Sequence, residues 1–290
     1  MALIKTNLDK LDFAKLYKKQ MKNSTFKSKS SSDWDKKAQN FNQNVINSPY
    51  IKEFTKRVDI SACETLLDVG SGPATISLAL APKLKEVFAL DYSTTMLELA
   101  NQNAKEKEIE NLVSIHKSWE DSWEDVPNAD IVIASRSMEV KDIKKALEKL
   151  NEKANKRVYL TTKVGGSFID IEILAQIKRD IVPRPDYIYL LNTLHSMGIF
   201  AKVDFIKTSS KKFDTQNEDE FIQRLKWSLG KISKKEEKIL REYFNTTYKN
   251  KKEKESLTWA FISWEKEFIN RPLENKMKNS NIDLLIDKLC

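Results

Sequence analysis

Asp68-Val69-Gly70-Ser71-Gly72-Pro73-Ala74 is the most informative stretch of this sequence. It follows the short apolar run 64–69, which is typical of a buried strand in a parallel sheet. It precedes residues 74–84, whose apolar side chains recur at helical spacing. Glycines let a ligand touch the backbone, and the start of a helix offers unpaired N–H groups to an anionic group. The stretch therefore predicts a strand, a ligand-binding turn and a helix.

A second acidic residue, Asp91, follows about 20 residues later, which is the spacing of many nucleotide-binding folds. Residues 85–91 predict a strand that ends in this acid, and Ser93-Thr94-Thr95 supplies residues that cap the start of a helix. An acid in this position can accept hydrogen bonds from both hydroxyls of a ribose. The glycine-rich turn and Asp91 together predict a nucleoside site.

Strands and helices continue to alternate along the chain. The sequence predicts further strands at 112–116, 129–134, 157–162, 200–206 and 257–264, and helices at 93–107, 141–154, 173–181, 187–197, 218–229 and 234–244. Such alternation is typical of an α/β fold with a doubly wound parallel sheet.

The composition excludes several classes of protein. With 40% hydrophobic and 32% charged residues, the chain is globular rather than disordered. Its two cysteines, Cys63 and Cys290, form no disulfide framework, and no Cys/His/acid cluster has metal-ligand spacing, so we expect no metal site. The first residues lack the apolar run of a signal peptide, and no stretch approaches the roughly 18 apolar residues of a membrane span. We therefore expect a cytoplasmic protein that does not bind a membrane.

The positive charge is concentrated at the N-terminus. The net charge of the 290 residues is +8, and residues 1–57 hold 13 basic and 5 acidic side chains, so the remainder is neutral. Lys15, Lys18, Lys19 and Lys22 fall on one face of a predicted helix. This face is either a solvated surface of a packing helix or an arm that binds RNA, and the scarcity of arginine weakens the second interpretation.

Two stretches resemble the class I S-adenosylmethionine-dependent methyltransferases: residues 67–73, which include the glycine-rich turn, and residues 89–97, which include Asp91. The resemblance covers residues 45–206 and 257–266. It implies a Rossmann-like sheet of seven strands, a helical N-terminal lid, a helical insertion before the last strand, and S-adenosyl-L-methionine as the cofactor. The expected division is an N-terminal segment at 1–58, a methyltransferase domain at 59–268 with its insertion at 208–256, and a tail at 269–290.

The resemblance also implies a cofactor site. In that family the first acid and the glycines surround the methionine part of the cofactor, the second acid binds the ribose, and the turn after the third strand holds the adenine. The corresponding residues and their neighbours here are Asp68, Gly70, Ser71, Gly72, Asp91, Tyr92, Met96, Ser118, Trp119 and Glu120, with Ser135 and Arg136 after the fourth strand.

This sequence departs from the family pattern at two places. Ala74 replaces the third glycine, which narrows the approach to the turn unless only helix packing requires a small residue. Ser118 replaces an acid in the adenine turn, where Glu120 competes with it for the adenine amino group. Trp119 either walls the adenine ring or packs beneath the third strand.

The candidates for catalysis and acceptor binding come from several segments. Arg136 and His195 are the candidate catalytic residues. Arg136 pairs with a substrate anion, with the cofactor carboxylate, or structurally with Glu139 or Asp142. The predicted acceptor pocket contains Tyr17, Trp34, Tyr50, Thr162, Arg184 and Tyr187. We expect in-line methyl transfer to a small molecule. The alternatives are an RNA methyltransferase that uses the basic segment, and a non-catalytic member that binds a nucleoside.

Overall fold

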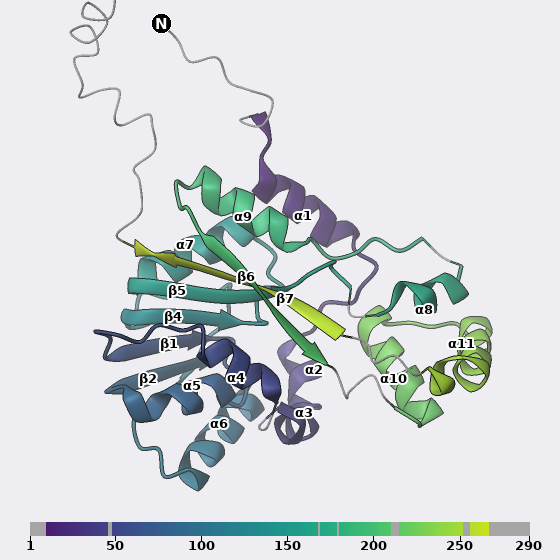
Figure 1. The fold of residues 1–290 in the computed structure, drawn as a ribbon, viewed down its shortest axis with the longest axis horizontal. Coiled ribbons are helices and arrows are strands. Elements are labelled where there is room, and N and C mark those ends of the chain that lie inside the picture. The colour runs from purple at the N-terminus through teal and green to yellow at the C-terminus, as the bar shows by residue number, and fades with distance from the viewer. Residues whose placement is uncertain are drawn as a thin grey trace, which may run out of the picture.

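A computed structural model describes residues 10–45, 48–167, 169–178, 180–209, 215–251 and 256–266. Its seven strands form one sheet in the order β3-β2-β1-β4-β5-β7-β6 (Figure 1). The strands are β1 (Thr65–Val69), β2 (Glu86–Asp91), β3 (Leu112–His116), β4 (Ala129–Ser135), β5 (Ala154–Lys163), β6 (Lys202–Ser209) and β7 (Ser256–Glu265). Neighbours from β3 to β5 pair in parallel, and β7 is antiparallel to both β5 and β6. The doubly wound seven-stranded fold is confirmed, with a mixed rather than wholly parallel sheet.

The helices of the described residues occupy four regions of the chain. Those before the sheet are α1 (Phe13–Asn23), α2 (Ser31–Asp35), α3 (Ala38–Val45) and α4 (Pro49–Thr55). Those between β1 and β5 are α5 (Thr75–Leu80), α6 (Thr94–Glu106) and α7 (Ile143–Lys153). Between β5 and β6 lie α8 (Ile171–Gln176) and α9 (Tyr187–Ser196), and between β6 and β7 lie α10 (Glu218–Leu229) and α11 (Lys234–Thr246). None of the helices in the described ranges is long and apolar enough to cross a membrane.

Successive residues of the central strands enter two cores, one on each face of the sheet. Leu66 and Ile131 pack with Phe54 of α4 and Ile76 of α5 in one core. Their neighbours Leu67 and Val132 pack in the other core, which includes residues of α7, α9 and α1. This alternation follows from the period of two along a strand, and because both faces are covered the strands are apolar throughout.

Helix boundaries differ from the sequence expectation where local chemistry intervenes. The helix expected at 74–84 ends as α5 at Leu80 and continues as a 3-10 turn at Ala81–Lys83, because Pro82 has no N–H for an α-helical bond. The helix expected at 173–181 begins earlier, since Asp170 accepts a hydrogen bond from the Glu172 backbone N–H and caps it.

Trp34, Ala38 and Phe41 are spaced in the sequence like the apolar face of one helix. In the structure they lie on two helices, because the chain turns between α2 and α3. The three side chains nevertheless share a cluster with Met96 and Leu99 of α6. The stripe therefore packs on α6, beside the glycine-rich turn.

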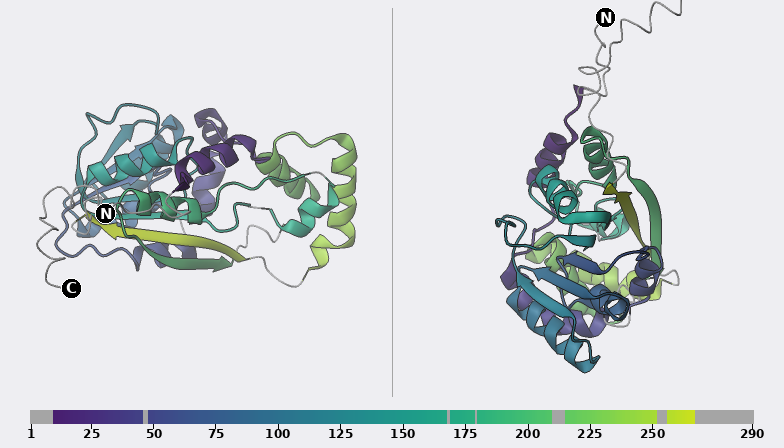
Figure 2. Two further views of the ribbon diagram at one scale, coloured as in Figure 1. Left: turned by 90° about the horizontal axis from the view of Figure 1, so that it is seen from above. Right: turned by 90° about the vertical axis from the view of Figure 1, so that its left-hand side faces the viewer.

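Helices α8, α10 and α11 form a third core away from the sheet (Figures 1 and 2). Phe26 from the N-terminal segment enters this core. The N–H of Lys27 donates to Ser228 O at 2.8 Å, and the rings of Trp34 and Trp227 meet edge to face at 5.5 Å. The N-terminal segment thus links the sheet to the helices inserted between β6 and β7. The expected tail at 269–290 lies outside the described residues.

Three residues of the glycine-rich turn have left-handed backbone conformations. Gly70 has a φ of +67°, Gly72 of +54° and Ala74 of +57°. Ala74 is fully buried and packs with Ala89, Ala100 and other apolar residues of the α5–α6 layer. Its methyl group therefore packs between α5 and α6. Its left-handed backbone conformation costs free energy that a glycine in this position would not lose.

Substitutions at Ala74 test this packing. We expect Ala74→Gly to change the free energy of unfolding by less than about 1 kcal/mol, because relief of left-handed strain offsets the lost methyl burial. Ala74→Val should lower it by at least about 2 kcal/mol, since a β-branched side chain is strained at positive φ and overfills the layer. Urea denaturation measures both values, and a valine variant as stable as the glycine variant would contradict this account.

Candidate functional site

The turns that follow β1, β2, β4 and β5 meet at one edge of the sheet, because these strands run parallel. In open α/β sheets, ligands bind at this edge, where the chain reverses its direction of winding. Here the reversal lies between β1 and β4. The structure therefore brings Asp68, Asp91 and Ser135 to the same edge.

Asp91 connects the turns after β1 and β2. Its Oδ2 accepts a hydrogen bond from the Gly72 N–H at 2.8 Å, and its Oδ1 accepts one from the Ser93 N–H at 2.9 Å. The side chain is 5% exposed, and burial raises the pKa of its carboxyl although the N–H donors oppose that shift. It has no ion pair with any described residue, so its remaining lone pairs suit hydroxyl donors.

Asp68 is the more deeply buried acid of the pair. Its Oδ2 accepts a hydrogen bond from Ser77 Oγ at 2.6 Å. Burial raises the pKa of this carboxyl to about 7, with a further increase from the negative charge of Asp91 and an opposing effect of the Ser77 bond. The sequence analysis missed Ser77, although a small polar residue inside an otherwise apolar helix was a signal for it.

The glycine-rich turn is in close contact with other elements. A Cβ on Gly70 would lie 2.4 Å from Ser137 Cβ, which no side chain could tolerate. A Cβ on Gly72 would meet Phe41 Cε1 at 3.8 Å and Met96 Sδ at 3.9 Å. The space above Gly72 is thus bounded by α3 and α6, and Phe41 of the N-terminal segment was missed as a candidate.

The N-terminal segment also bonds to the residues after β2. Ser93 Oγ donates a hydrogen bond to Asp35 Oδ1 at 2.6 Å, and Tyr92 Oη donates one to the carbonyl of Lys29 at 3.2 Å. Ser71 is half-buried, and its Oγ bonds weakly to the neighbouring Gly72 carbonyl at 3.4 Å. Residues 29–41 therefore cover the predicted cofactor edge.

The expected adenine turn is held by its own contacts. The Ser118 carbonyl accepts a hydrogen bond from Trp123 Nε1 at 2.9 Å, and the Ser118 N–H donates one to the Asp121 carboxylate. Trp119 stacks on Trp123 with ring centroids 5.3 Å apart and touches the sheet core. Glu120 is exposed and lies 3.6 Å from Lys141 Nζ. Trp119 thus occupies the position of a packing residue, with one ring face against Trp123.

Arg136 follows β4 in a left-handed conformation, with φ +60°. Its N–H donates to Thr161 O and Thr161 Oγ1 at 3.2 and 3.1 Å. The guanidinium carbon lies 4.3 Å from the centre of the Tyr50 ring, and the Tyr50 hydroxyl lies 2.9 Å from Ser135 Oγ and 2.6 Å from Thr161 Oγ1. Burial lowers the pKa of Arg136, and it makes no ion pair with a described residue; Glu139 and Asp142 pair instead with Arg184 and Lys18.

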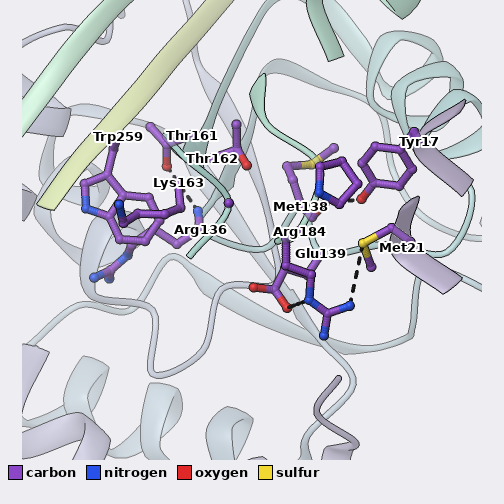
Figure 3. Close-up of a pocket in the computed structure, with 12 residues that line it drawn as sticks. Tyr17, Met21, Arg136, Met138, Glu139, Thr161, Thr162, Lys163, Arg184 and Trp259 are labelled. Atoms are coloured by element: carbon purple, nitrogen blue, oxygen red, sulfur yellow. Dashed lines mark hydrogen bonds and ion pairs between the residues drawn. The ribbon is translucent and has the colours of Figure 1, made fainter. Parts of the chain in front are cut away.

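A cavity of about 30 Å3 opens beside Arg136 at the ends of β4 and β5 (Figure 3). Three predicted acceptor residues line it: Tyr17, Thr162 and Arg184. The buried Tyr17 hydroxyl donates to the carbonyls of Met138 and Val140 at 3.1 and 3.0 Å, which fixes α1 against the loop after β4. Burial raises the pKa of Tyr17 far above its usual value. Thr161 and Lys163, which end the same predicted strand as Thr162, also line it. The lining residues that sequence reasoning did not select are Met21, Met138, Glu139, Gly166, Pro185 and Trp259.

Four predicted residues lie elsewhere than in the cavity lining. The Tyr50 ring stacks against the guanidinium of Arg136, while Trp34 packs between Phe41 and Trp227. Tyr187 packs edge to face on Phe205 of β6. His195 is exposed on α9 and contacts Phe200. The described residues contain no group of three or more His, Cys, Asp or Glu side chains arranged for a metal ion.

The residues at this edge fit a nucleoside cofactor. Gly72 leaves a space that a Cβ would enter, and Asp91 is a buried carboxylate whose hydrogen-bond donors among the described residues are backbone N–H groups. A ribose supplies hydroxyl donors for such a group. The fit rests on Gly72 and Asp91 rather than on the adenine turn.

Comparison with known proteins is consistent with this site. A family model described as a methyltransferase domain matches residues 60–251, which is more than half of the chain. A Haemophilus influenzae protein described as uncharacterized is 35% identical over 258 residues, covering 88% of this chain and 96% of that protein.

Solved structures share the fold. The YcgJ protein of Bacillus subtilis has a TM-score of 0.51 at 17% identity, covering 74% of this chain and 97% of that one. A Haemonchus contortus phosphoethanolamine N-methyltransferase 2, solved with phosphomonomethylethanolamine and S-adenosylhomocysteine, has a TM-score of 0.51 at 15% identity, covering 88% of this chain and 60% of that one. At these identities the likeness concerns the fold alone.

The raised pKa of Asp68 makes a prediction for stability. Between its usual pKa of 3.8 and the folded value of about 7, the native state binds a proton that the unfolded state has released. The free energy of unfolding therefore falls as the pH rises through this range. Asp68→Asn removes this dependence. We expect the free energy of unfolding of the variant, taken relative to that of wild type, to be higher at pH 8 than at pH 5 by on the order of 2 kcal/mol.

Urea denaturation at both pH values measures the difference. Asp125→Asn is the matched control, because Asp125 is exposed and its pKa is lowered by Lys117 rather than raised by burial. Parallel pH profiles of wild type and Asp68→Asn would contradict the assignment.

Proposed function

This chain belongs to the class I S-adenosylmethionine-dependent methyltransferases, and we propose that it transfers a methyl group to a small-molecule acceptor in the cavity beside Arg136. The small cavity at the ends of β4 and β5 carries this proposal. It adjoins the predicted cofactor edge, and residues of α1 and of the loop containing Arg184 line it. A small concave pocket favours a small acceptor over a nucleic acid strand.

The chain's own residues hold the cofactor at the edge formed by β1 and β2. Asp91 accepts hydrogen bonds from the ribose hydroxyls, and Gly70, Ser71 and Gly72 surround the methionine part together with Asp68. When bound, S-adenosyl-L-methionine supplies a methyl group on a positively charged sulfur. We further propose that residues 29–41 act as a lid over this edge, because Asp35 and Lys29 already bond to Ser93 and Tyr92.

Catalysis rests on alignment and exclusion of water. Holding two reactants in line can supply about 7–11 kcal/mol of a barrier. Thr162 offers a hydroxyl to the cavity, and Tyr17 and Trp259 close it from two sides. The cavity volume of about 30 Å3 holds little more than one or two water molecules, so a wall has to move when an acceptor enters. The scarcity of cysteine supports the cytoplasm as the location.

RNA is the alternative acceptor, because Lys15, Lys19 and Lys22 form an exposed face on α1. A triple variant in which these lysines become glutamates tests it without touching the cavity. We expect wild type and variant to bind a mixed single-stranded RNA equally weakly, with no steep dependence on salt. Salt-sensitive binding that the variant loses would favour the RNA interpretation instead.

Asp91 is the residue on which cofactor binding should depend most. Asp91→Ala should weaken binding of S-adenosylhomocysteine by at least about tenfold, because the ribose loses its acceptor and two backbone N–H groups lose their partner. Isothermal titration calorimetry measures the affinity. Asp125→Ala is the matched control and should bind as wild type does. Unchanged affinity in Asp91→Ala would refute the ribose assignment, and absence of heat with wild type would refute the proposed function.

A further inference from the structure

The cavity beside Arg136 has more cationic than anionic side chains in its lining. Arg136, Lys163 and Arg184 are its basic residues, and Glu139 is the sole carboxylate among the described residues that line it. Lys163 Nζ donates a hydrogen bond to the carbonyl of Val164 at 2.8 Å. Arg136 and Arg184 are therefore the two cations on which the argument for an anionic ligand rests, since a poorly solvated guanidinium is costly without a close anion.

Arg184 is the least satisfied of these cations. The residue is 6% exposed, and its buried Nε has no hydrogen-bond partner among the described residues. Its Nη2 donates to Ser28 Oγ at 3.0 Å, and its Nη1 contacts only the sulfur of Met21, at 3.7 Å. Glu139 Oε2 lies 3.7 Å from Nε, which is too far for a hydrogen bond. Because these N–H groups are not all used, the Arg184 guanidinium can still bind an oxyanion through two parallel hydrogen bonds.

The backbone that presents Arg184 is fixed in place. Its N–H donates to the carbonyl of Gly166 at 2.8 Å, and Gln20 Nε2 donates to the carbonyls of Pro183 and Arg184, at 3.2 Å each. A Cβ on Gly166 would lie 2.0 Å from the Arg184 carbonyl oxygen, so the two loops touch where only glycine fits. Preorganisation of this kind lowers the entropy cost of binding a ligand.

Arg136 supplies a second positive group on another side of the cavity. In Figure 3 it lies beside Trp259, while Arg184 lies beside Glu139 and Met21. The guanidinium of Arg136 stacks on Tyr50 and makes no ion pair with a described residue. Arg136 therefore has no carboxylate at ion-pair distance among the described residues, and Arg184 has only Glu139 there, beyond hydrogen-bond distance.

We propose, building on the proposed methyl transfer, that the acceptor carries a carboxylate or phosphate group that binds Arg184 in place of Glu139, with Arg136 adding to the positive field. The Glu139 side chain is 46% exposed, so it can leave Arg184 for solvent at little cost. In the free protein Glu139 partly neutralises the arginine, and the acceptor anion replaces it with true hydrogen bonds. A cationic acceptor is disfavoured by the same field.

Calorimetric titration of the full chain with inorganic phosphate and with malonate tests this. We expect wild type to bind at least one of them, and the preferred anion identifies the acceptor group. Arg184→Lys should weaken that binding by about tenfold, because an ammonium cannot form two parallel bonds. Glu139→Gln should tighten it by about threefold or more, because the competing carboxylate is gone.

Two matched controls accompany these variants. Glu148→Gln removes a carboxylate whose side chain is 43% exposed and pairs with Lys144 outside the cavity. Arg157→Lys alters an arginine that pairs with Asp59, also outside it. Both controls should bind the anion as wild type does.

Failure to bind either anion, or equal binding by wild type and Glu139→Gln, would overturn the proposal. A parallel titration with S-adenosylhomocysteine separates it from the proposed function. If Arg184→Lys weakens binding of S-adenosylhomocysteine by as large a factor as it weakens binding of the anion, Arg184 holds the cofactor carboxylate and the acceptor assignment is wrong. If wild type binds the anion but not the nucleoside, the proposed methyl transfer fails while the anion site stands.

Discussion

The arrangement of this edge depends on the buried carboxylate of Asp91. It accepts hydrogen bonds from the Gly72 N–H of the turn after β1 and from the Ser93 N–H at the start of α6. Ser93 Oγ in turn donates to Asp35 in α2. A single side chain thus connects two strand ends, and one further hydrogen bond extends the connection to the N-terminal segment. The position of the covering segment is therefore tied to Asp91, the residue that we propose to bind the ribose.

Charge changes sign along the edge of the sheet. At the ends of β1 and β2, Asp68 and Asp91 are buried carboxyls whose pKa values are raised by burial. At the ends of β4 and β5, Arg136 and Lys163 line the cavity together with Arg184. We propose different partners for the two groups: ribose hydroxyls for Asp91 and an acceptor anion for the arginines. Asp68 and Arg136 already affect each other electrostatically across the edge, each favouring the charged form of the other.

Local patterns in the sequence predicted the strands and the glycine-rich turn because these depend on neighbours along the chain. Buried strands appear in the sequence as apolar runs, and Asp68 and Asp91 lie at the carboxyl ends of two of them, as the next-to-last residue of β1 and the last residue of β2. The sequence also pointed to Arg136, since a charged side chain directly after a buried strand is unfavourable unless a partner compensates its charge. Glu139 and Trp259 could not be selected this way, because β7 and the loop after β4 meet the cavity only through tertiary packing. Trp119 shows the same limit: its family position suggested adenine, and its contact with Trp123 depends on how the following loop folds back.

Hydrogen bonds anchor the walls of the cavity to one another. Helix α1 is held by the Tyr17 hydroxyl, which bonds to two carbonyls of the loop after β4, and by Gln20, which bonds to the carbonyls of Pro183 and Arg184. Glu139 lies between Met138 and Val140 in that loop, so a shift of the loop backbone would move the carbonyls that hold α1. Rotation of the exposed Glu139 side chain needs no such shift. Under the proposed anion binding, an acceptor can therefore displace the Glu139 side chain from Arg184 while the backbone anchor of α1 stays in place.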